Sequence, residues 1–289
     1  MMQKRSLSKD DKLRFCIDYV RLNKLTKVVY QPLPDITTMI QFLEGKLLFA
    51  KLDLSAGFHQ IEIEESSRKY TAFRHMSDTY EFMRVPFGLT NAPSHFQRAM
   101  THEVLRDLVQ DVCMVYIDDI IVWGSEEDFL YNLRRVLQRL KEHCIILKRS
   151  KCLFGVRKIN YLGHTLSGTG IELSDTNKKV FQELVIPSTV TQLRSALGLY
   201  SYFRQFLPDF ATNASKLYKM CSGKDKRKKL VWDQEKLCAF QKIKDTILEA
   251  SKLHFIVGDG ELRLYTDASN YAFGGYLAQL QQDPTIHFG

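Results

Sequence analysis

The sequence predicts an α+β fold, built from short apolar strands and amphipathic helices. Residues 114–123 read MVYIDDIIVW, and the two apolar runs predict a pair of strands with Asp118 and Asp119 at the turn between them. A second apolar run, LLFAKL, leads into Asp53 and predicts another strand. Residues 128–144 instead carry leucines spaced three to four apart, which predicts an amphipathic helix with an apolar face of Leu130, Leu133, Leu137 and Leu140.

The rest of the chain follows the same two patterns. Alternating apolar residues predict a strand at 13–19, and an apolar run predicts another at 80–85. Pro93 suits a first helical turn, with Asn91 as a candidate cap before it. Further helices are expected over 36–45, 174–214 and 232–253.

Composition is that of an ordinary globular protein with a basic charge. The formal net charge is +8, which fits a polyanionic partner such as a nucleic acid, although many proteins of this charge have none. No apolar run approaches the ~18 residues of a membrane span. The six cysteines show no Cys-x-x-Cys pair and no histidine at zinc spacing, so reduced thiols that pack in an intracellular protein are expected.

The aspartates are the chemically informative residues. Two adjacent carboxylates at the tip of a buried hairpin are costly unless a cation offsets their charge. Three aspartates at the ends of two strands suit a hard divalent cation such as Mg²⁺, which prefers oxygen ligands and keeps part of its coordination for substrate phosphates. The alternative is that Asp53, Asp118 and Asp119 are ordinary turn residues, as the polar pair Asp10 and Asp11 must be.

Four motifs in a fixed order resemble those of reverse transcriptases. YIDD at 116–119 resembles the Tyr-x-Asp-Asp box, and FAKLDLSAGFHQI at 49–61 resembles the motif of the first catalytic aspartate. LRFCIDYVRLNKLT at 13–26 resembles the fingers motif, and VPFGLTNAPSHFQRAM at 85–100 the segment lining the nucleotide pocket. The segments GFHQI, MRVPFGLTNAP and YLGH are similar to those of polymerases from gypsy-type long-terminal-repeat retrotransposons.

This resemblance implies a right-hand polymerase with fingers, palm and thumb, followed by a connection region. The expected division is fingers and palm at 1–165, thumb at 166–222, connection at 223–258 and a truncated RNase H-like segment at 259–289. The resemblance also implies a hairpin at 159–166, which would be the primer grip, and a hairpin at 261–280, which would be the first of the RNase H-like segment. Because that nuclease needs further carboxylates beyond Asp267, no RNase H activity is expected from this chain.

The resemblance also assigns the site. Asp53, Asp118 and Asp119 would be catalytic and would hold two Mg²⁺ ions, with Mn²⁺ as a substitute, for transfer of a nucleotide to a primer 3′-hydroxyl. Arg14 would grip the incoming triphosphate, and Lys4 is the candidate for a neighbouring phosphate-binding lysine, with Arg5 and Lys9 as alternatives, since SLSKDD is longer than the turn usual in the family.

A nucleotide pocket follows from the same motifs. The resemblance places four residues at the nucleotide: Leu54, Phe58, Phe87 and Gly88. The Phe58 ring would lie under the sugar and exclude a ribose 2′-hydroxyl; the alternative is a phenylalanine of the core. The turn LSAGF after Asp53 offers backbone amides that could cradle phosphates.

The implied partners are an RNA or DNA template with its primer and a dNTP, with no membrane; the oligomeric state stays open. The implied location is intracellular, in the cytoplasm, a virus-like particle or the nucleus. Two other functions stay open: a truncated or domesticated copy that binds primer–template without copying it, and a structural partner subunit of a polymerase.

Overall fold

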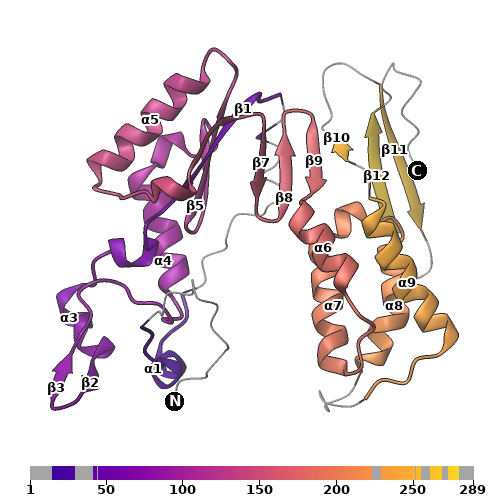
Figure 1. Cartoon of the computed structure of the whole chain (residues 1–289), viewed down its shortest axis with the longest axis horizontal. Helices are drawn as coiled ribbons and strands as arrows, with labels where there is room; N and C mark the ends of the chain where they lie inside the picture. Colours follow the sequence, from indigo (N-terminus) through magenta and orange to yellow (C-terminus); the bar gives the residue numbers. More distant parts are fainter. Residues whose placement is uncertain are drawn as a thin grey trace. The chain divides into compact units, whose positions relative to one another are not determined.

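The computed structural model describes residues 15–29, 42–43, 45–222, 229–250, 252–254, 261–268 and 273–279 (Figure 1). These residues form two compact units. The first takes the described residues up to Phe42 together with Leu48–Val156, and the second takes those of Leu43–Leu47 and those from Arg157 on. No helix in the described part of the chain is both long and apolar enough to cross a bilayer.

An antiparallel sheet is the centre of the first unit. Its strand order is β4-β5-β1-β6, where β4 is Cys113–Tyr116, β5 is Asp119–Gly124, β1 is Leu48–Asp53 and β6 is Leu153–Val156. The hairpin and the strand predicted around the aspartates are confirmed.

The pairing of β1 with β5 decides which residues share a face. The register runs from Leu48 opposite Gly124 to Asp53 opposite Asp119. Successive side chains of a strand point to opposite faces, so Leu52 and Ile120 face the hydrophobic core while the two aspartates lie on the other face. The register therefore places the charges on the face away from this core.

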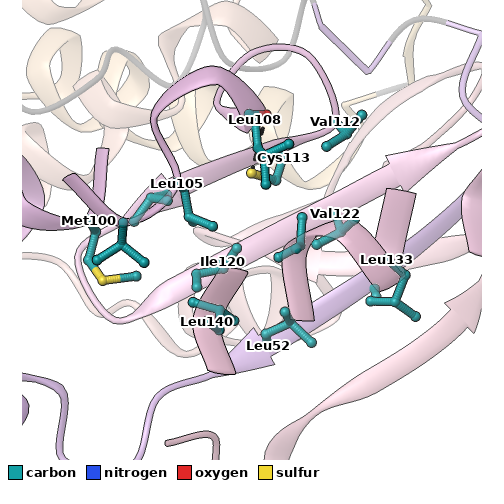
Figure 2. Packing of buried hydrophobic residues seen from close by; sticks show 14 of the residues in the cluster. Leu52, Met100, Leu105, Leu108, Val112, Cys113, Ile120, Val122, Leu133 and Leu140 are labelled. Atoms are coloured by element: carbon teal, nitrogen blue, oxygen red, sulfur yellow. Dashed lines mark hydrogen bonds between the residues drawn. The ribbon is translucent and has the colours of Figure 1, made fainter. Parts of the chain in front are cut away.

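Figure 2 shows the core of the first unit. Leu52, Ile120 and Val122 of the sheet meet Leu133 and Leu140 of α5, which is Phe129–Glu142. Residues of the segment before β4 complete the cluster, among them Met100, Leu105 and Leu108.

The predicted helix at 128–144 is confirmed, but its apolar face was partly wrong. The buried residues are Phe129, Leu133, Val136 and Leu140, and Leu130 is 73% exposed. Starting the stripe at Phe129 gives steps of four, three and four residues, which keep the apolar side chains on one face.

Helix α4, Ala92–Arg98, begins where Pro93 predicted, with Asn91 at the N-cap position. The Asn91 side chain does not cap the helix, because its amide donates to the Lys27 carbonyl and its oxygen accepts from the Val29 amide. The helix continues as a π-helical segment, η3, over Ala99–Val104.

The strand predicted at 13–19 is wrong for the described residues 15–19, which form no strand and lead into helix α1, Val20–Leu25. The Asp18 carboxylate accepts from the Val20 amide at 2.8 Å and so favours a turn at that point. Of the strand predicted at 80–85, only Tyr80 lies in a strand, β3 (Asp78–Tyr80), and Arg84 forms an isolated β-bridge with Glu62. The other short elements of this unit are η1 (Gly57–Gln60), α3 (Glu65–Arg68), η2 (Lys69–Thr71), β2 (Phe73–His75), β3 (Asp78–Tyr80), η4 (Arg106–Leu108) and η5 (Arg149–Lys151).

The second unit combines a sheet of order β10-β9-β8-β7, helices and a separate hairpin. The predicted helices at 174–214 and 232–253 and the hairpins at 159–166 and 261–280 are confirmed; the helix predicted over 36–45 falls mainly on residues outside the described set. The elements are β7 (Lys158–Tyr161), β8 (His164–Ser167), β9 (Gly170–Leu173), α6 (Asp175–Glu183), α7 (Val190–Tyr202), η6 (Arg204–Phe206), α8 (Phe210–Met220), α9 (Gln234–Leu248), β10 (Leu253–His254), β11 (Leu262–Ala268) and β12 (Phe273–Gln279).

Local capping explains where these helices begin. Thr189 and Gln192 form a capping box at the start of α7, and Ser174 and Asp233 cap α6 and α9. All six cysteines are free thiols, as their spacing predicted; Cys113 and Cys221 are buried in the packing, but others are exposed.

The β7–β8 hairpin is fixed by a buried histidine. His164 is 1% exposed, and its ring lies 5.2 Å from the Phe203 ring and 5.8 Å from those of Tyr202 and Phe206. Its Nδ1 has no hydrogen-bond partner among the described residues. Burial lowers the pKa of His164 to about 4, so the ring is neutral in the folded protein near pH 7.

This burial predicts a pH-dependent stability. The unfolded chain binds a proton at His164 below pH ~6.5, whereas the folded chain binds it only near pH 4. The free energy of unfolding therefore falls as the pH drops from ~6.5 to about 4. His164→Phe is expected to remove about 2 kcal/mol of the loss between pH 7 and pH 5. Urea unfolding at several pH values measures it, with the exposed His75→Phe as control. Equal pH slopes for wild type and His164→Phe would contradict the prediction.

Candidate active site

The structure brings the three predicted aspartates together. Asp53 ends β1 and pairs directly with Asp119, the first residue of β5. Asp118 lies in the two-residue turn before it, and its carbonyl accepts a hydrogen bond of 3.3 Å from the amide of Leu54. Like charges placed opposite each other in a sheet repel, so this arrangement needs compensation.

The turn that carries Asp118 has an unusual backbone. Tyr116 pairs with Asp119 to close the hairpin, which leaves Ile117 and Asp118 as the loop. Ile117 has a φ of 53°, a value at which glycine is the usual residue and a β-branched side chain is strained. Such a conformation costs roughly 1–3 kcal/mol and persists only where surrounding contacts hold it.

The Asp118 carboxylate is partly buried. Its Oδ1 is buried and has no hydrogen-bond partner within the described part of the chain. A Cβ added at Gly57 would collide with this oxygen and would lie 3.1 Å from Cζ of Phe96, so only glycine fits at that position. Burial, and then the charges of Asp119 and Asp53, raise the pKa of Asp118, while Lys151 acts in the opposite direction.

Two lysines lie against the other two carboxylates. Lys51, on β1, forms an ion pair of 3.1 Å with Asp119, and Lys151, in η5, forms one of 3.2 Å with Asp53. The Lys151 side chain is 55% exposed, and that of Lys51 is 22% exposed. These ammonium groups offset part of the repulsion within the aspartate cluster.

As the side chains stand, no group of three or more His, Cys, Asp or Glu residues in the described ranges is arranged to enclose a metal ion. The donor set nevertheless fits a hard divalent cation. Three carboxylates interact with one another, and the buried Oδ1 of Asp118 is unpaired. Oxygen ligands of this kind are those that Mg²⁺ and Mn²⁺ take in proteins.

Phe58 stands beside the cluster between two other rings. Its ring centre lies 5.5 Å from that of Phe87 and 5.4 Å from that of Phe96, both in edge-on geometry. Phe96 is 1% exposed and belongs to the core, whereas Phe58 is only partly buried. The Phe58 ring is therefore a partly buried wall that is held by two other rings and also packs against the core cluster. The nucleotide-facing role and the core role of Phe58 both stay predictions.

The predicted pocket residues Phe87 and Gly88 adjoin this wall. Gly88 has a φ of 97°, which requires glycine. Asn23 of α1 holds the loop by donating to the Gly88 carbonyl at 2.7 Å and accepting from the Thr90 amide at 3.0 Å.

The amides of the turn after Asp53 are less available than the sequence suggested. Leu54 is 4% exposed, and its amide donates a hydrogen bond to the backbone carbonyl of Asp118. The Ser55 amide donates to the Ile146 carbonyl at 2.9 Å. The part of the LSAGF hypothesis that uses these two amides for phosphate is therefore wrong.

Arg14 and Lys4 lie outside the described residues, as does the side chain of Asp267. Sequence reasoning also missed four residues that shape the site: Lys51, Gly57, Gln97 and Lys151. No sequence signal marked Gln97, because its helix neighbours include the polar Ser94 and Thr101 and apolar periodicity therefore does not predict its burial. The lysines reach the aspartates only through strand pairing and the fold around η5.

An antiparallel sheet with aspartates at the end of one strand and at the turn of a neighbouring hairpin is the arrangement expected for the palm of a right-hand polymerase. Residues 3–166 match the family model described as reverse transcriptase (RNA-dependent DNA polymerase). This chain belongs to the reverse transcriptase family, which confirms the resemblance seen in its motifs. Residues 232–288 match a model of the RNase H-like domain found in reverse transcriptase.

Relatives and solved structures agree. The chain is 35% identical over 278 residues to the Pol polyprotein of transposon opus and 37% over 273 residues to that of transposon 297, both from Drosophila melanogaster. These alignments take 93% of this chain but 28% and 25% of the relatives, so the chain spans about a quarter of their length. A foamy viral protease–reverse transcriptase in complex with double-stranded DNA matches with a TM-score of 0.79 and 25% identity, over 91% of this chain and 46% of that one.

The raised pKa of Asp118 predicts an effect on stability without metal. A carboxyl group whose pKa is raised by folding costs stability once the pH passes its ordinary value, and the whole cost is present above the pKa of the folded state. Asp118→Asn is expected to raise the melting temperature in chelator, by a margin that grows from acidic to neutral pH.

Thermal unfolding in EDTA across this pH range measures the effect. Asp78→Asn, at an exposed carboxylate of β3, is the control and should leave the melting temperature unchanged. An Asp118→Asn protein that melts at or below the wild-type temperature at neutral pH would show that the carboxylate is not under the inferred repulsion.

Proposed function

We propose that this chain is the RNA-directed DNA polymerase of a retrotransposon Pol protein, adding dNTPs to a primer 3′-hydroxyl. The observation that carries the proposal is the pairing of Asp53 with Asp119, with Asp118 beside them, in a chain of the reverse transcriptase family. Little covalent chemistry falls to the protein in such a transfer, because positioning and charge neutralisation lower the barrier.

Asp53, Asp118 and Asp119 would hold the divalent ions. Divalent ions held by these carboxylates would supply positive charge to activate the primer hydroxyl and to neutralise the triphosphate. The three carboxylates would set where the ions bind, and the burial of Oδ1 limits how far the Asp118 carboxylate can move. Lys51 and Lys151 neutralise Asp119 and Asp53 when no ion is bound.

Phe58 would select the sugar. Its ring, fixed by Phe87 and Phe96, would meet the face of a nucleotide bound at the aspartates and leave no room for a 2′-hydroxyl. Leu54 and Gly88 would shape the same pocket through the backbone. Arg14 and Lys4 are proposed to bind the triphosphate, since an arginine fork suits phosphate oxygens.

The proposed partners are an RNA or DNA template with its primer. Support comes from the +8 charge and from the foamy viral relative, whose structure holds double-stranded DNA. Phosphate contacts release counterions, so binding would weaken steeply with salt. The transposon relatives favour action inside the cell, in the cytoplasm, a virus-like particle or the nucleus.

Primer extension on an RNA template with dNTPs and Mg²⁺ tests the activity. Wild type is expected to extend the primer, and Asp118→Asn to lose at least about 10³-fold in rate, because charge at the reacting phosphate is no longer balanced. Asp78→Asn is the matched control and should extend at the wild-type rate. Extension by Asp118→Asn at that rate would refute the site, and salt-sensitive hybrid binding without extension by wild type would favour the non-copying alternative.

The sugar filter is tested separately. Phe58→Val removes the ring but keeps a β-branched apolar side chain, so ribonucleotide incorporation is expected to rise by about 10²-fold relative to deoxynucleotide incorporation, as removal of a steric contact allows. Competition between rNTP and dNTP in single-nucleotide extension measures the ratio. Phe73→Val, at a ring of β2 in the same unit, should leave the ratio unchanged. An unchanged ratio in Phe58→Val would mean that Phe58 does not face the sugar.

A further inference from the structure

Gln97 is buried beneath the hairpin that carries the aspartates. It belongs to α4 and is 2% exposed. Its Oε1 accepts a hydrogen bond of 2.7 Å from the amide of Ile117, and its Nε2 donates one of 2.9 Å to the carbonyl of Val115. One side chain therefore grips the backbone on both sides of Tyr116, just before Asp118.

The gripped residue is the strained one. Ile117 has a φ of 53°, and a β-branched residue reaches this region only when its surroundings impose it. Two contacts do so here: the Ile117 side chain packs against the core cluster, and its amide is bonded to Gln97. Without the second contact the Ile117 backbone would be free to relax.

The backbone of Ile117 sets the position of Asp118. Relaxation at Ile117 rotates the following peptide and moves the Cα–Cβ bond of Asp118. Gly57 lies against Oδ1 of Asp118, and the Leu54 amide donates to the backbone carbonyl of Asp118. Such a movement would therefore disturb the contacts that orient the Asp118 carboxylate.

We propose that Gln97 is a positioning residue for the aspartate site. By holding Ile117 in its left-handed conformation, it fixes the Asp118 carboxylate in the orientation that binds a divalent cation. This inference rests on the proposed function, since it concerns the same ion site. It assigns a role to a side chain that would touch neither ion nor nucleotide.

The chemistry of the clamp is specific to glutamine. A primary amide presents an acceptor to the Ile117 amide and a donor to the Val115 carbonyl at once. Glutamate has the same shape but would place a carboxylate oxygen against that carbonyl, and methionine has the length but neither bond. Buried polar groups left unpaired in this way are costly, so both variants should release the turn.

Mn²⁺ binding to the full chain is the test, with free Mn²⁺ measured by electron paramagnetic resonance and no nucleotide present. Gln97→Met and Gln97→Glu are expected to weaken Mn²⁺ affinity by about 10- to 100-fold, the usual effect of removing a group that orients a metal ligand. Ile117→Gly in the Gln97→Met background should restore most of the affinity, because glycine adopts a positive φ without the clamp.

Gln192→Met is the matched control. Gln192 also bonds backbone amides through its Oε1, at Ser188 and Thr189, but it caps α7 in the second unit. It should lower the melting temperature without changing Mn²⁺ affinity. This control distinguishes weaker Mn²⁺ binding caused by a general loss of stability from weaker binding caused by a displaced Asp118 carboxylate.

The outcomes are distinct. Folded Gln97→Met protein that binds Mn²⁺ as wild type does would overturn the clamp, as would a loss of affinity that Ile117→Gly fails to rescue. If wild type binds Mn²⁺ and the variants behave as expected but no primer is extended, the clamp stands and the proposed polymerase function fails. Absence of Mn²⁺ binding in wild type would overturn both.

Discussion

The register of β1 against β5 is the constraint on which the site depends. It sets Asp53 opposite Asp119 at the end of two strands, with Asp118 in the adjoining turn, and so concentrates negative charge where a sheet would not hold it by itself. The apolar residues on the opposite face of the same strands pack into a large core with α5, and this packing keeps the register in place. Packing of the core therefore stabilises an arrangement of carboxylates that repel one another.

Helix α4 connects this core to both halves of the site. Phe96 packs against Phe58, the ring proposed to face the sugar, and the next residue, Gln97, bonds the turn before Asp118. Adjacent residues of a helix point about 100° apart, so one turn of α4 supports two different features. Gly57 contacts both parts of the site: a Cβ atom at this position would meet the Asp118 carboxylate and the Phe96 ring.

The sequence was sufficient for the parts of the structure that depend on local pattern. The aspartate hairpin and the helix at 128–144 follow from apolar periodicity, and the start of α4 follows from Pro93. Where alternation lacked a partner strand, as at residues 15–19, the prediction failed. The contacts of Lys51 with Asp119 and of Lys151 with Asp53 join residues 68 and 98 positions apart, and no local pattern carries that information.

Backbone strain lies on both loops that bear the aspartates, and both are held in the same way. Ala56, in the turn after Asp53, has a φ of 50°, close to that of Ile117. Gln60 donates to the carbonyls of Ser55 and Ile146 at 2.8 and 2.9 Å and accepts from the Ile146 amide at 2.7 Å, as Gln97 grips the other loop from both sides. A glutamine amide satisfies a backbone donor and acceptor together without adding charge. Beside three carboxylates whose balance with cations sets the chemistry, a neutral clamp fixes the geometry and leaves the electrostatics unchanged.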